Sequence, residues 1–404
     1  MILDTRMPVT DADRVKIQEL REIVKDHITP YYDTDYNLLR WLKGHDYNMD
    51  IIKPKLINHL LLRRKWNLDA LPDKPRDHVV HMHWKNGLTG EAIKTPNCVV
   101  NIEQTGINDY WGMSNVHPIN HILIARMHDL ESMLRAVMEL EKKTGEQCAV
   151  LYIMDLSEIK MDRRLMTLVT GGLAAISAFM AENYVEMVHS FVLVNVPSFI
   201  SAIWTAAGPL LPERTRNKVK ILGSRWKEDI LTLADGKCLP SYWNEEGKDG
   251  PFGAPIERGV PYSLDEYWKG EIPDHAQVLQ VPAGKTGYFD VEAKEGTHLS
   301  WELHSNGHFA FSIYEVNKDD EAMDPSQMTR FYPHFGKIPG PTLVPVRDLA
   351  PVQKTGVYRF WFGNQHAWFH TLKVHYVVET NTVVRATIRL WNKQLGYEAL
   401  LEEL

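Results

Sequence analysis

Residues 190–212 read SFVLVNVPSFISAIWTAAGPLLP and contain no charged residue. The first part, residues 191–196, is apolar and rich in β-branched side chains, which is typical of a strand buried on both faces. The second part, residues 198–211, predicts a short apolar helix that the chain enters through Pro197. Pro197 and Pro209 would each disrupt one continuous helix, so this stretch does not predict a membrane-spanning segment.

An uncharged helix that follows a central strand indicates a functional surface, because soluble proteins rarely expose that much apolar area without a function for it. The predicted uses are the wall and lid of a lipid cavity, a membrane contact or a groove for a partner. An ordinary core strand followed by a core helix is the alternative.

Composition places this chain of 404 residues among ordinary globular proteins, with 44% hydrophobic and 24% charged residues. The formal net charge of -7 disfavours a nucleic-acid-binding protein that works through bulk positive charge. Cys98, Cys148 and Cys238 have neither a disulfide nor a metal-binding spacing, which favours a reducing compartment. Residues 1–14 carry acids where a signal peptide would have its apolar core, so we expect a cytoplasmic protein.

Helices dominate the first part of the chain. Thr10 or Asp11 can cap a helix over residues 12–25, and the pattern predicts a later helix that ends at Gly44. The next helix ends in the basic run of residues 63–65. We interpret this run as a solvated face, with a role at a phosphate-rich surface as the alternative.

Strands and helices alternate in the middle of the chain. Residues 79–84, 98–103 and 149–154 are short apolar runs that predict strands. A long helix is predicted over residues 118–142 and a second, buried helix over residues 163–182. The glycines and hydroxyl residues of the second helix favour burial inside the protein over a membrane span. This order predicts an α/β fold with a mixed or parallel sheet.

The composition changes after residue 243. Residues 244–267 are rich in Gly and Pro and predict a linker between units that fold separately. From residue 272 apolar and polar residues alternate and turn residues separate the runs, which predicts an antiparallel β-sandwich. Residues 386–404 predict an amphipathic helical tail.

One long segment, residues 181–243, resembles a known family. It carries Asn-Tyr-x-Glu at residues 183–186, the apolar strand and helix, and then Leu-Pro-Glu-Arg-Thr-Arg-x-Lys at residues 211–218. Ile-Leu-Gly-Ser, Trp-Lys-Glu and Leu-Pro follow in order. This succession resembles the C-terminal half of the CRAL-TRIO lipid-binding domain, the fold of phosphatidylinositol/phosphatidylcholine transfer proteins. Where that family usually has Gly after an Asp-Leu turn, this chain has Glu158.

The C-terminal part resembles a second family, the GOLD (Golgi dynamics) domain. Its signature, Gly-x-Tyr-x-Phe-x-Phe-x-Asn followed by an aromatic-rich turn, stands here at Gly356, Tyr358, Phe360, Phe362 and Asn364. The whole arrangement resembles the supernatant protein factor and tocopherol-associated protein group. We therefore divide the chain into a helical CRAL-TRIO N-terminal region, a CRAL-TRIO lipid-binding domain, a linker, a GOLD-like β-sandwich and a helical tail: residues 1–72, 73–247, 248–271, 272–380 and 381–404.

The predicted site has two parts. The expected wall and lid of the cavity are the large apolar residues Phe191, Leu193, Phe199, Ile203, Trp204, Leu210 and Leu211. The family resemblance implies the second part, because its phosphatidylinositol-binding members contact the inositol phosphate through the Asn-Tyr-x-Glu carboxylate and a Thr-x-x-Lys turn. Those positions are Glu186, Thr215 and Lys218, with an ordinary surface helix as the alternative. Those members carry a basic pair where this chain has His45-Asp46, and Asp46 would repel a phosphate.

Catalytic and metal-binding motifs are weak in this sequence. Residues 284–286, Gly-Lys-Thr, imitate the end of a phosphate loop but lie in a strand pattern. His78, His81 and His83 cluster on a predicted strand where His81 and His83 would share a face, and a surface strand is preferred over a metal site. Neither a Gly-x-Ser-x-Gly elbow nor a His-Glu-x-x-His motif is present. We expect no catalytic residues, no metal and no cofactor.

These patterns favour a non-enzymatic protein that binds a hydrophobic lipid and transfers or presents it between membranes. The ligand would be a phospholipid such as phosphatidylinositol, bound weakly, or a neutral tocopherol- or isoprenoid-like lipid. The alternative is a lipid-sensing adaptor that recruits trafficking or signalling partners through the GOLD-like domain, and a lipid hydrolase is disfavoured. Expected partners are the lipid, a transient peripheral membrane surface and a protein bound by the sandwich, without nucleic acid.

Overall fold

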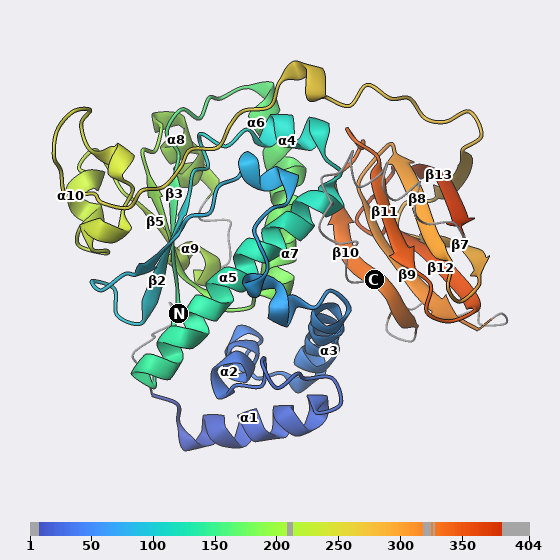
Figure 1. The fold of residues 1–404 in the computed structure, drawn as a ribbon, viewed down its shortest axis with the longest axis horizontal. Coiled ribbons are helices and arrows are strands. Elements are labelled where there is room, and N and C mark those ends of the chain that lie inside the picture. The colour runs from blue at the N-terminus through green and yellow to red at the C-terminus, as the bar shows by residue number, and fades with distance from the viewer. Residues whose placement is uncertain (1–7, 208–212, 318–324, 326–327, 382–404) are drawn as a thin grey trace.

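A computed structural model describes residues 8–207, 213–317, 325 and 328–381 of the chain. Figure 1 shows a layer of N-terminal helices, a five-stranded sheet with helices around it, and a C-terminal sandwich of two sheets. The predicted fold class, an α/β domain with a helical N-terminal cap followed by an antiparallel β-sandwich, is confirmed. The predicted helical tail lies outside the described residues.

The N-terminal layer consists of α1 (Asp11–Val24), α2 (Asp35–Gly44) and α3 (Met49–Lys65). Thr10 begins α1 with a capping box, because its hydroxyl accepts the Asp13 N–H while the Asp13 carboxylate accepts the Thr10 N–H. Apolar residues spaced three or four apart lie on the inner faces of these helices and are buried: Ile17, Leu20, Leu38, Leu39, Leu42, Leu56 and Leu60.

Arg63, near the end of α3, is buried and does not form the predicted solvated face. Its guanidinium donates to both carboxylate oxygens of Glu131 on α5 (Ile119–Thr144), over 2.7 and 2.9 Å, and to Asp69 over 2.6 Å. Tyr184 donates to the same Glu131 carboxylate over 2.8 Å. Burial disfavours the charge on Arg63, but Glu131 outweighs this effect and the pKa of the guanidinium is raised. A charged, fully paired group therefore joins α3 to α5.

The five-stranded sheet has the strand order β1-β2-β3-β4-β5. Its first pair, β1 and β2, is antiparallel, and the remaining neighbours are parallel. The strand bounds are β1 (Leu88–Glu91), β2 (Cys98–Glu103), β3 (Ala149–Asp155), β4 (Val188–Val194) and β5 (Val219–Ile221). The other helices of this unit are α4 (Tyr110–Val116), α6 (Arg163–Thr170), α7 (Gly172–Asn183), α8 (Ser198–Ala207), α9 (Glu213–Lys218) and α10 (Trp226–Ile230). The strands predicted at residues 98–103 and 149–154 are confirmed.

The strand predicted at residues 79–84 is wrong, because these residues form a 3-10 helix, η2 (Val79–Met82). The His78 side chain accepts a hydrogen bond from the Val80 N–H, and the Trp84 N–H donates to the Val80 carbonyl over 2.9 Å. The local hydrogen bonds are satisfied within the turn, so no strand partner is needed. His81 and His83 therefore do not share a strand face.

The helix predicted over residues 163–182 is interrupted and only partly buried. α6 and α7 meet at Gly171, whose φ of -110° and ψ of -102° break the helix. Phe179 on α7 is buried as expected, but α6 buries none of its residues. The prediction of a buried helix is therefore wrong for α6. Among the described residues, α6 and α7 together form the one helical stretch long and apolar enough, by length and composition, to cross a bilayer.

Glu158 occupies the turn position where the resembled family usually has Gly. Its φ is 65°, in the left-handed region that favours glycine. The turn after β3 therefore keeps the glycine-like backbone although a carboxylate side chain stands there.

The C-terminal sandwich packs two four-stranded antiparallel sheets, with strand orders β10-β9-β12-β7 and β11-β8-β13-β6. Its interior is aromatic, and Phe289 stacks on Phe360 with ring centroids 4.9 Å apart. The strand bounds are β6 (Gln277–Val281), β7 (Thr286–Ala293), β8 (His298–Ser305), β9 (Phe309–Val316), β10 (Thr329–Ile338), β11 (Val346–Pro351), β12 (Gly356–Gly363) and β13 (Leu372–Asn381). The motif of residues 284–286 lies at the β6–β7 turn, which is not the strand-to-helix turn of a phosphate loop.

The segment that joins the two units lies along the α/β unit for part of its length (Figure 1). Phe252 is buried against Trp243, with ring centroids 5.6 Å apart. Tyr262 stacks on His83 with ring centroids 3.5 Å apart. A segment with linker composition is thus anchored by aromatic contacts.

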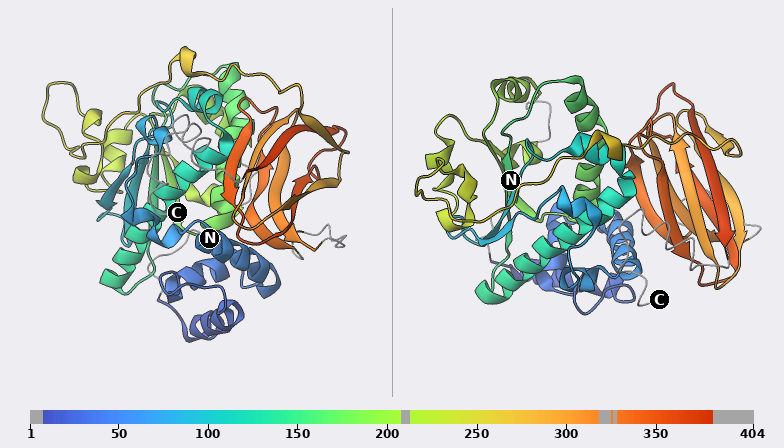
Figure 2. Two further views of the ribbon diagram at one scale, coloured as in Figure 1. Left: turned by 45° about the vertical axis from the view of Figure 1, so that its right-hand side comes forward. Right: turned by 45° about the horizontal axis from the view of Figure 1, so that its top comes forward.

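The sandwich packs against α3, α5 and α7, and both views of Figure 2 show it beside these helices. Asn120 and His121, at the start of α5, both donate to the backbone carbonyl of Arg347, over 2.8 and 3.0 Å. Phe179 on α7 faces Phe335 on β10, with ring centroids 6.4 Å apart. The two units therefore meet in a packed interface, which the linker composition did not predict.

Candidate functional site

β4 carries two of the predicted cavity residues on one of its faces. Phe191 and Leu193 are half-buried, whereas Val192 and Val194, which point the other way, are fully buried. Phe191 lies beside Tyr152 of β3, with ring centroids 5.4 Å apart. The expectation that β4 is buried on both faces is therefore wrong, and the face of Phe191 and Leu193 is partly open.

The open part of this face lies at the carboxyl ends of the parallel strands. Met154 on β3, Leu193 on β4 and Ile221 on β5 are neighbours in the strand register, and all three are half-buried. Nearer the middle of β3 the same face is covered by α5, where Arg126 donates to Tyr152. In open α/β sheets ligands bind outside the carboxyl ends of the strands. The side chains available there are apolar.

α8 begins directly after β4, at a turn that polar side chains hold in place. Asn195 has a φ of 52°, and its amide donates to Asp155 at the end of β3 over 2.8 Å. Trp243 donates to the other oxygen of Asp155, also over 2.8 Å. These bonds fix the point at which α8 leaves the sheet.

Three of the predicted lid residues lie on α8, which contains no charged residue. Phe199 and Trp204 are half-buried, and Ile203 is 45% exposed. Leu210 and Leu211, the other two, lie outside the described residues. α8 thus places apolar side chains beyond the open end of the sheet while part of its surface still faces solvent.

α6 adds a second exposed apolar helix, which Figure 1 shows at the same edge of the molecule as α8. Met166 is 52% and Val169 is 50% exposed, and both belong to α6. The sequence analysis assigned α6 to the core and so missed its exposed surface. Apolar exposure on two neighbouring connections is more than a soluble protein usually leaves uncovered.

The predicted head-group residues come together in part. Lys218, the last residue of α9, donates to the Glu186 carboxylate over 2.9 Å and to the Val188 carbonyl over 3.1 Å. The two charged side chains are only 12% and 8% exposed. Thr215 lies on α9, and its side chain is outside the described part of the structure. Glu186 itself has a φ of 52°, so a left-handed turn presents its carboxylate to Lys218.

The end of α2 approaches this pair closely. A Cβ on Gly44 would lie 2.0 Å from a Val185 methyl carbon and 3.4 Å from the Glu186 Cγ, so only glycine fits. The turn with Asp46, expected to repel a phosphate, follows at once. A cation that the sequence analysis missed, Lys55 on α3, also reaches this corner, with its Nζ 3.5 Å from the His45 Nε2. No local pattern marked Lys55, because the turn after α2 brings it to His45.

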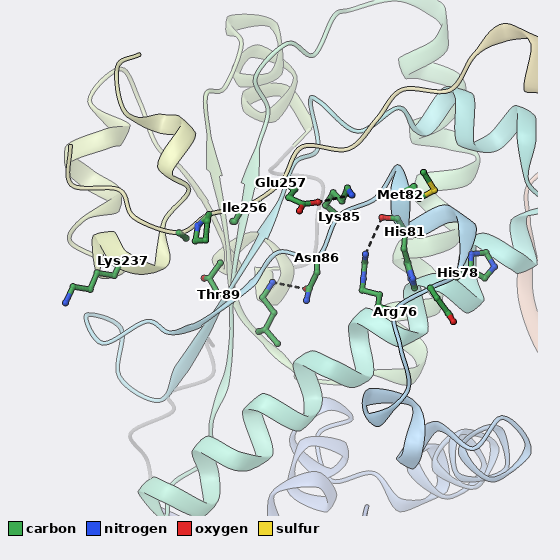
Figure 3. A pocket seen from close by; sticks show the side chains of 14 residues that line it. Arg76, His78, His81, Met82, Lys85, Asn86, Thr89, Lys237, Ile256 and Glu257 are labelled. Atoms are coloured by element: carbon green, nitrogen blue, oxygen red, sulfur yellow. Dashed lines mark hydrogen bonds and ion pairs between the residues drawn. The ribbon is translucent and has the colours of Figure 1, made fainter. Parts of the chain in front are cut away.

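A separate groove of about 580 Å³ lies between η2, β1 and residues 254–257 (Figure 3). Three of its charged side chains are paired, since Arg76 donates to Asp129 over 2.7 Å and Lys85 lies 2.9 Å from Glu257. Of the described residues, none of the predicted wall, lid or head-group positions lines this groove. Its walls mix charged residues with apolar ones such as Met82 and Ile256, so the groove is not a purely apolar cavity for an acyl chain.

The histidines near η2 do not form a metal centre in the part of the chain that the structure describes, where no three His, Cys, Asp or Glu side chains come together. The rings of His78 and His81 are 5.8 Å apart. Burial lowers the pKa of His78 to about 2 and that of His81 to about 4. Both imidazoles are therefore neutral at physiological pH.

Three segments of the chain match protein families. Residues 96–244 match the CRAL/TRIO domain. Residues 271–384 match a family described as F28H7_8_C:-like, C-terminal domain, and residues 9–71 match a domain of unknown function, DUF8435. The C-terminal description does not name the GOLD domain, so that resemblance stays a prediction.

Known relatives are similar along much of the chain. CRAL-TRIO domain-containing protein F28H7.8 of Caenorhabditis elegans is 28% identical over 378 residues, which cover 89% of this chain and 88% of that protein. Phosphatidylinositol/phosphatidylcholine transfer protein SFH4 of Arabidopsis thaliana is 20% identical over 246 residues, 58% of this chain and 40% of that protein. The solved structure of Sfh5 gives a TM-score of 0.47 at 16% identity, covering 62% of this chain and 93% of that one.

Proposed function

We propose, from the CRAL/TRIO domain that residues 96–244 form, that this protein binds one hydrophobic lipid and carries or presents it between membranes. The lipid's apolar chain would lie on the open sheet face of Phe191 and Leu193, beneath α8. The observation that carries this proposal is an apolar, half-covered face at the carboxyl ends of the strands, followed by an uncharged helix.

Burial alone can hold such a ligand. Each methylene removed from water contributes roughly 0.8 kcal/mol, so an acyl chain needs no covalent bond to stay in place. The same energy opposes release into water, so exchange has to occur where α8 contacts a membrane. The exposed apolar surface of α8 and α6 is suited to that contact. This scheme requires no catalytic residue, and it suits a cytoplasmic protein that visits membranes transiently.

For the head group, we propose the Glu186–Lys218 pair as the binding point. A phosphate would interact with the Lys218 ammonium, and inositol hydroxyls would donate to the Glu186 carboxylate. The relative named as a phosphatidylinositol/phosphatidylcholine transfer protein supports this ligand class. The nearby Asp46 weakens the attraction for phosphate, so a neutral tocopherol- or isoprenoid-like lipid is the competing ligand.

An adaptor role is the second candidate, favoured by the docked sandwich. Phe335 of β10 faces Phe179 on α7, and α7 follows the exposed α6 after the break at Gly171. A change at α6 on lipid loading would thus be passed to the sandwich, which would recruit a protein partner.

The test is lipid extraction from the purified full chain, followed by mass spectrometry and by a transfer assay between donor and acceptor vesicles. We expect one lipid class to be enriched over bulk membrane lipid and the same lipid to move between vesicles. Enrichment without transfer would favour the adaptor. A chain that neither retains nor transfers phosphatidylinositol, phosphatidylcholine or tocopherol would contradict both roles.

A further inference from the structure

Four loops of the sandwich gather into one surface, which we call the loop end. The Gly284 N–H donates to the Asn364 carbonyl over 3.0 Å, and the Gly340 N–H donates to the His308 Nδ1 over 3.0 Å. The His366 Nε2 donates to the His308 carbonyl, also over 3.0 Å. Segments far apart in sequence thus lie side by side, and the loop end consists of residues 282–285, 306–308, 339–345 and 364–371.

Two adjacent aromatic side chains project from the loop end into solvent. Trp368 is 86% exposed and Phe369 is 95% exposed, the two highest values among the large hydrophobic residues that the structure describes. Leu343 in the neighbouring loop is 43% exposed. Removing a Trp or Phe side chain from water is favourable, so leaving both exposed forgoes a stabilisation. Such a pair indicates a surface that is covered only in a complex.

The charge of the loop end is opposite to that of the chain. None of its four loops contains Asp or Glu, although the whole chain has a net charge of -7. Lys285 lies in one of the loops, and Lys337 and Lys373 flank two others. Lys285 and Lys373 are exposed. The loop end therefore presents lysines around the exposed side chains of Trp368 and Phe369.

We propose that the loop end docks on an anionic bilayer, with Trp368 and Phe369 inserted at the boundary of head groups and acyl chains. Aromatic side chains concentrate at that depth, and lysines are attracted to the negative surface of an anionic leaflet. A protein partner fits less well, because a specific interface buries about 800 Å² on each side, more than two side chains at a loop tip present.

The position of the loop end also supports docking on a bilayer. A Cβ on Gly171, between α6 and α7, would lie 3.5 Å from the Pro339 Cβ of the loop end. The junction of α6 and α7 therefore lies against one loop of the loop end. This docking surface lies in the sandwich and does not depend on a lipid in the cavity, so it goes beyond the proposed transfer function.

The test is flotation of the full chain with vesicles of phosphatidylcholine alone or mixed with phosphatidylserine, at low and high ionic strength. We expect binding to the mixed vesicles, and a loss of about tenfold or more when Trp368→Ser and Phe369→Ser are combined. Lys285→Glu with Lys373→Glu should abolish the preference for phosphatidylserine. Leu264→Ser is the matched control, since Leu264 is 71% exposed on the connecting segment.

The proposal is overturned if the aromatic double variant binds the mixed vesicles as well as the unchanged chain, or if Leu264→Ser causes the same loss. Capture of a protein by the loop end without vesicle binding would also overturn it. Circular dichroism checks that each variant is folded. Vesicle binding is measured separately from the lipid that co-purifies with the protein. If the protein proves to carry no lipid, the vesicle-binding result still tests the docking proposal.

Discussion

Lys218 donates to Glu186 over 2.9 Å, and both side chains are nearly buried. The proposed head-group point therefore contains a preformed ion pair. We predict that Lys218→Gln lowers phosphatidylinositol pickup about tenfold, because a charge-assisted bond to phosphate is lost. Uptake of tocopherol should persist. Pickup of each lipid from labelled vesicles measures this, with Lys218→Arg as the charge-keeping control.

An equal loss of both lipids in Lys218→Gln would indicate misfolding. No loss of phosphatidylinositol would remove the head-group assignment.

The buried pair of Arg63 and Glu131 gives a stability prediction. Arg63→Met leaves the Glu131 carboxylate without its main partner in the interior, which should cost about 3–5 kcal/mol of unfolding free energy. Arg64 is the matched control, since it is exposed and donates to the backbone carbonyls of Asp26 and His27. Arg64→Met should cost less than about 1 kcal/mol. Urea unfolding followed by circular dichroism compares the two, and similar losses would contradict the role given to Arg63.

The sequence predicted elements well where the signal was local. Thr10 begins α1 with a capping box, Gly44 ends α2, and alternating residues mark the sandwich strands. It failed where tertiary contacts decide. The apolar pattern of α6 is the same for a core helix and an exposed one, and exposure depends on which elements cover it. Arg63 reads as a surface residue until the fold brings Glu131, 68 positions later, to its guanidinium.

The candidate site was predictable to the extent that motifs carry it. The resemblance selected Glu186 and Lys218, and the fold brings them together across 32 positions. Lys55 and the exposed α6 were missed, because neither has a spacing that distinguishes it from an ordinary helix surface. Phe191 and Leu193 were named as cavity wall, but the sequence also indicated burial on both faces of β4, since an apolar strand has the same composition whether or not both faces are covered.

Buried neutral histidines predict a loss of stability on acidification. The pKa values of His78, His81 and His117 are lowered by burial to about 2, 4 and 3, from 6.5. An unfolded chain protonates these groups below pH 6.5 while the folded one does not, so stability is present above 6.5 and falls as the pH drops towards 4. Between about pH 7.5 and about pH 5.5 each should cost roughly 1 kcal/mol.

Urea unfolding at the two pH values checks this histidine prediction, and His81→Gln should flatten the dependence by one histidine's share. His81 faces Asp129 and Arg76, which act on its charge in opposite directions, so burial dominates. An unchanged pH dependence in His81→Gln would contradict the assignment.

The interface between the two units predicts that they stabilise each other. Asn120 and His121 donate to Arg347, and Phe179 faces Phe335. Removing the chain after residue 271 would uncover this apolar surface of α5 and α7, so we expect a lower melting temperature than that of the full chain. Thermal unfolding by circular dichroism compares the two chains. A truncated chain with the full chain's melting temperature would show that the sandwich contributes nothing to the α/β unit.

Trp204 tests the proposed movement of α8. It is half-buried on a helix without charges, and an indole prefers the membrane interface, where its ring is apolar and its N–H stays hydrated. Trp204→Asp places a carboxylate where α8 would meet the bilayer, so we expect lipid exchange between vesicles to slow while the fold survives. Trp204→Phe keeps the apolar ring and should retain most of the exchange rate. Unchanged transfer by Trp204→Asp, with normal circular dichroism, would remove the lid assignment, because a helix that crosses into the interface cannot carry that charge without cost.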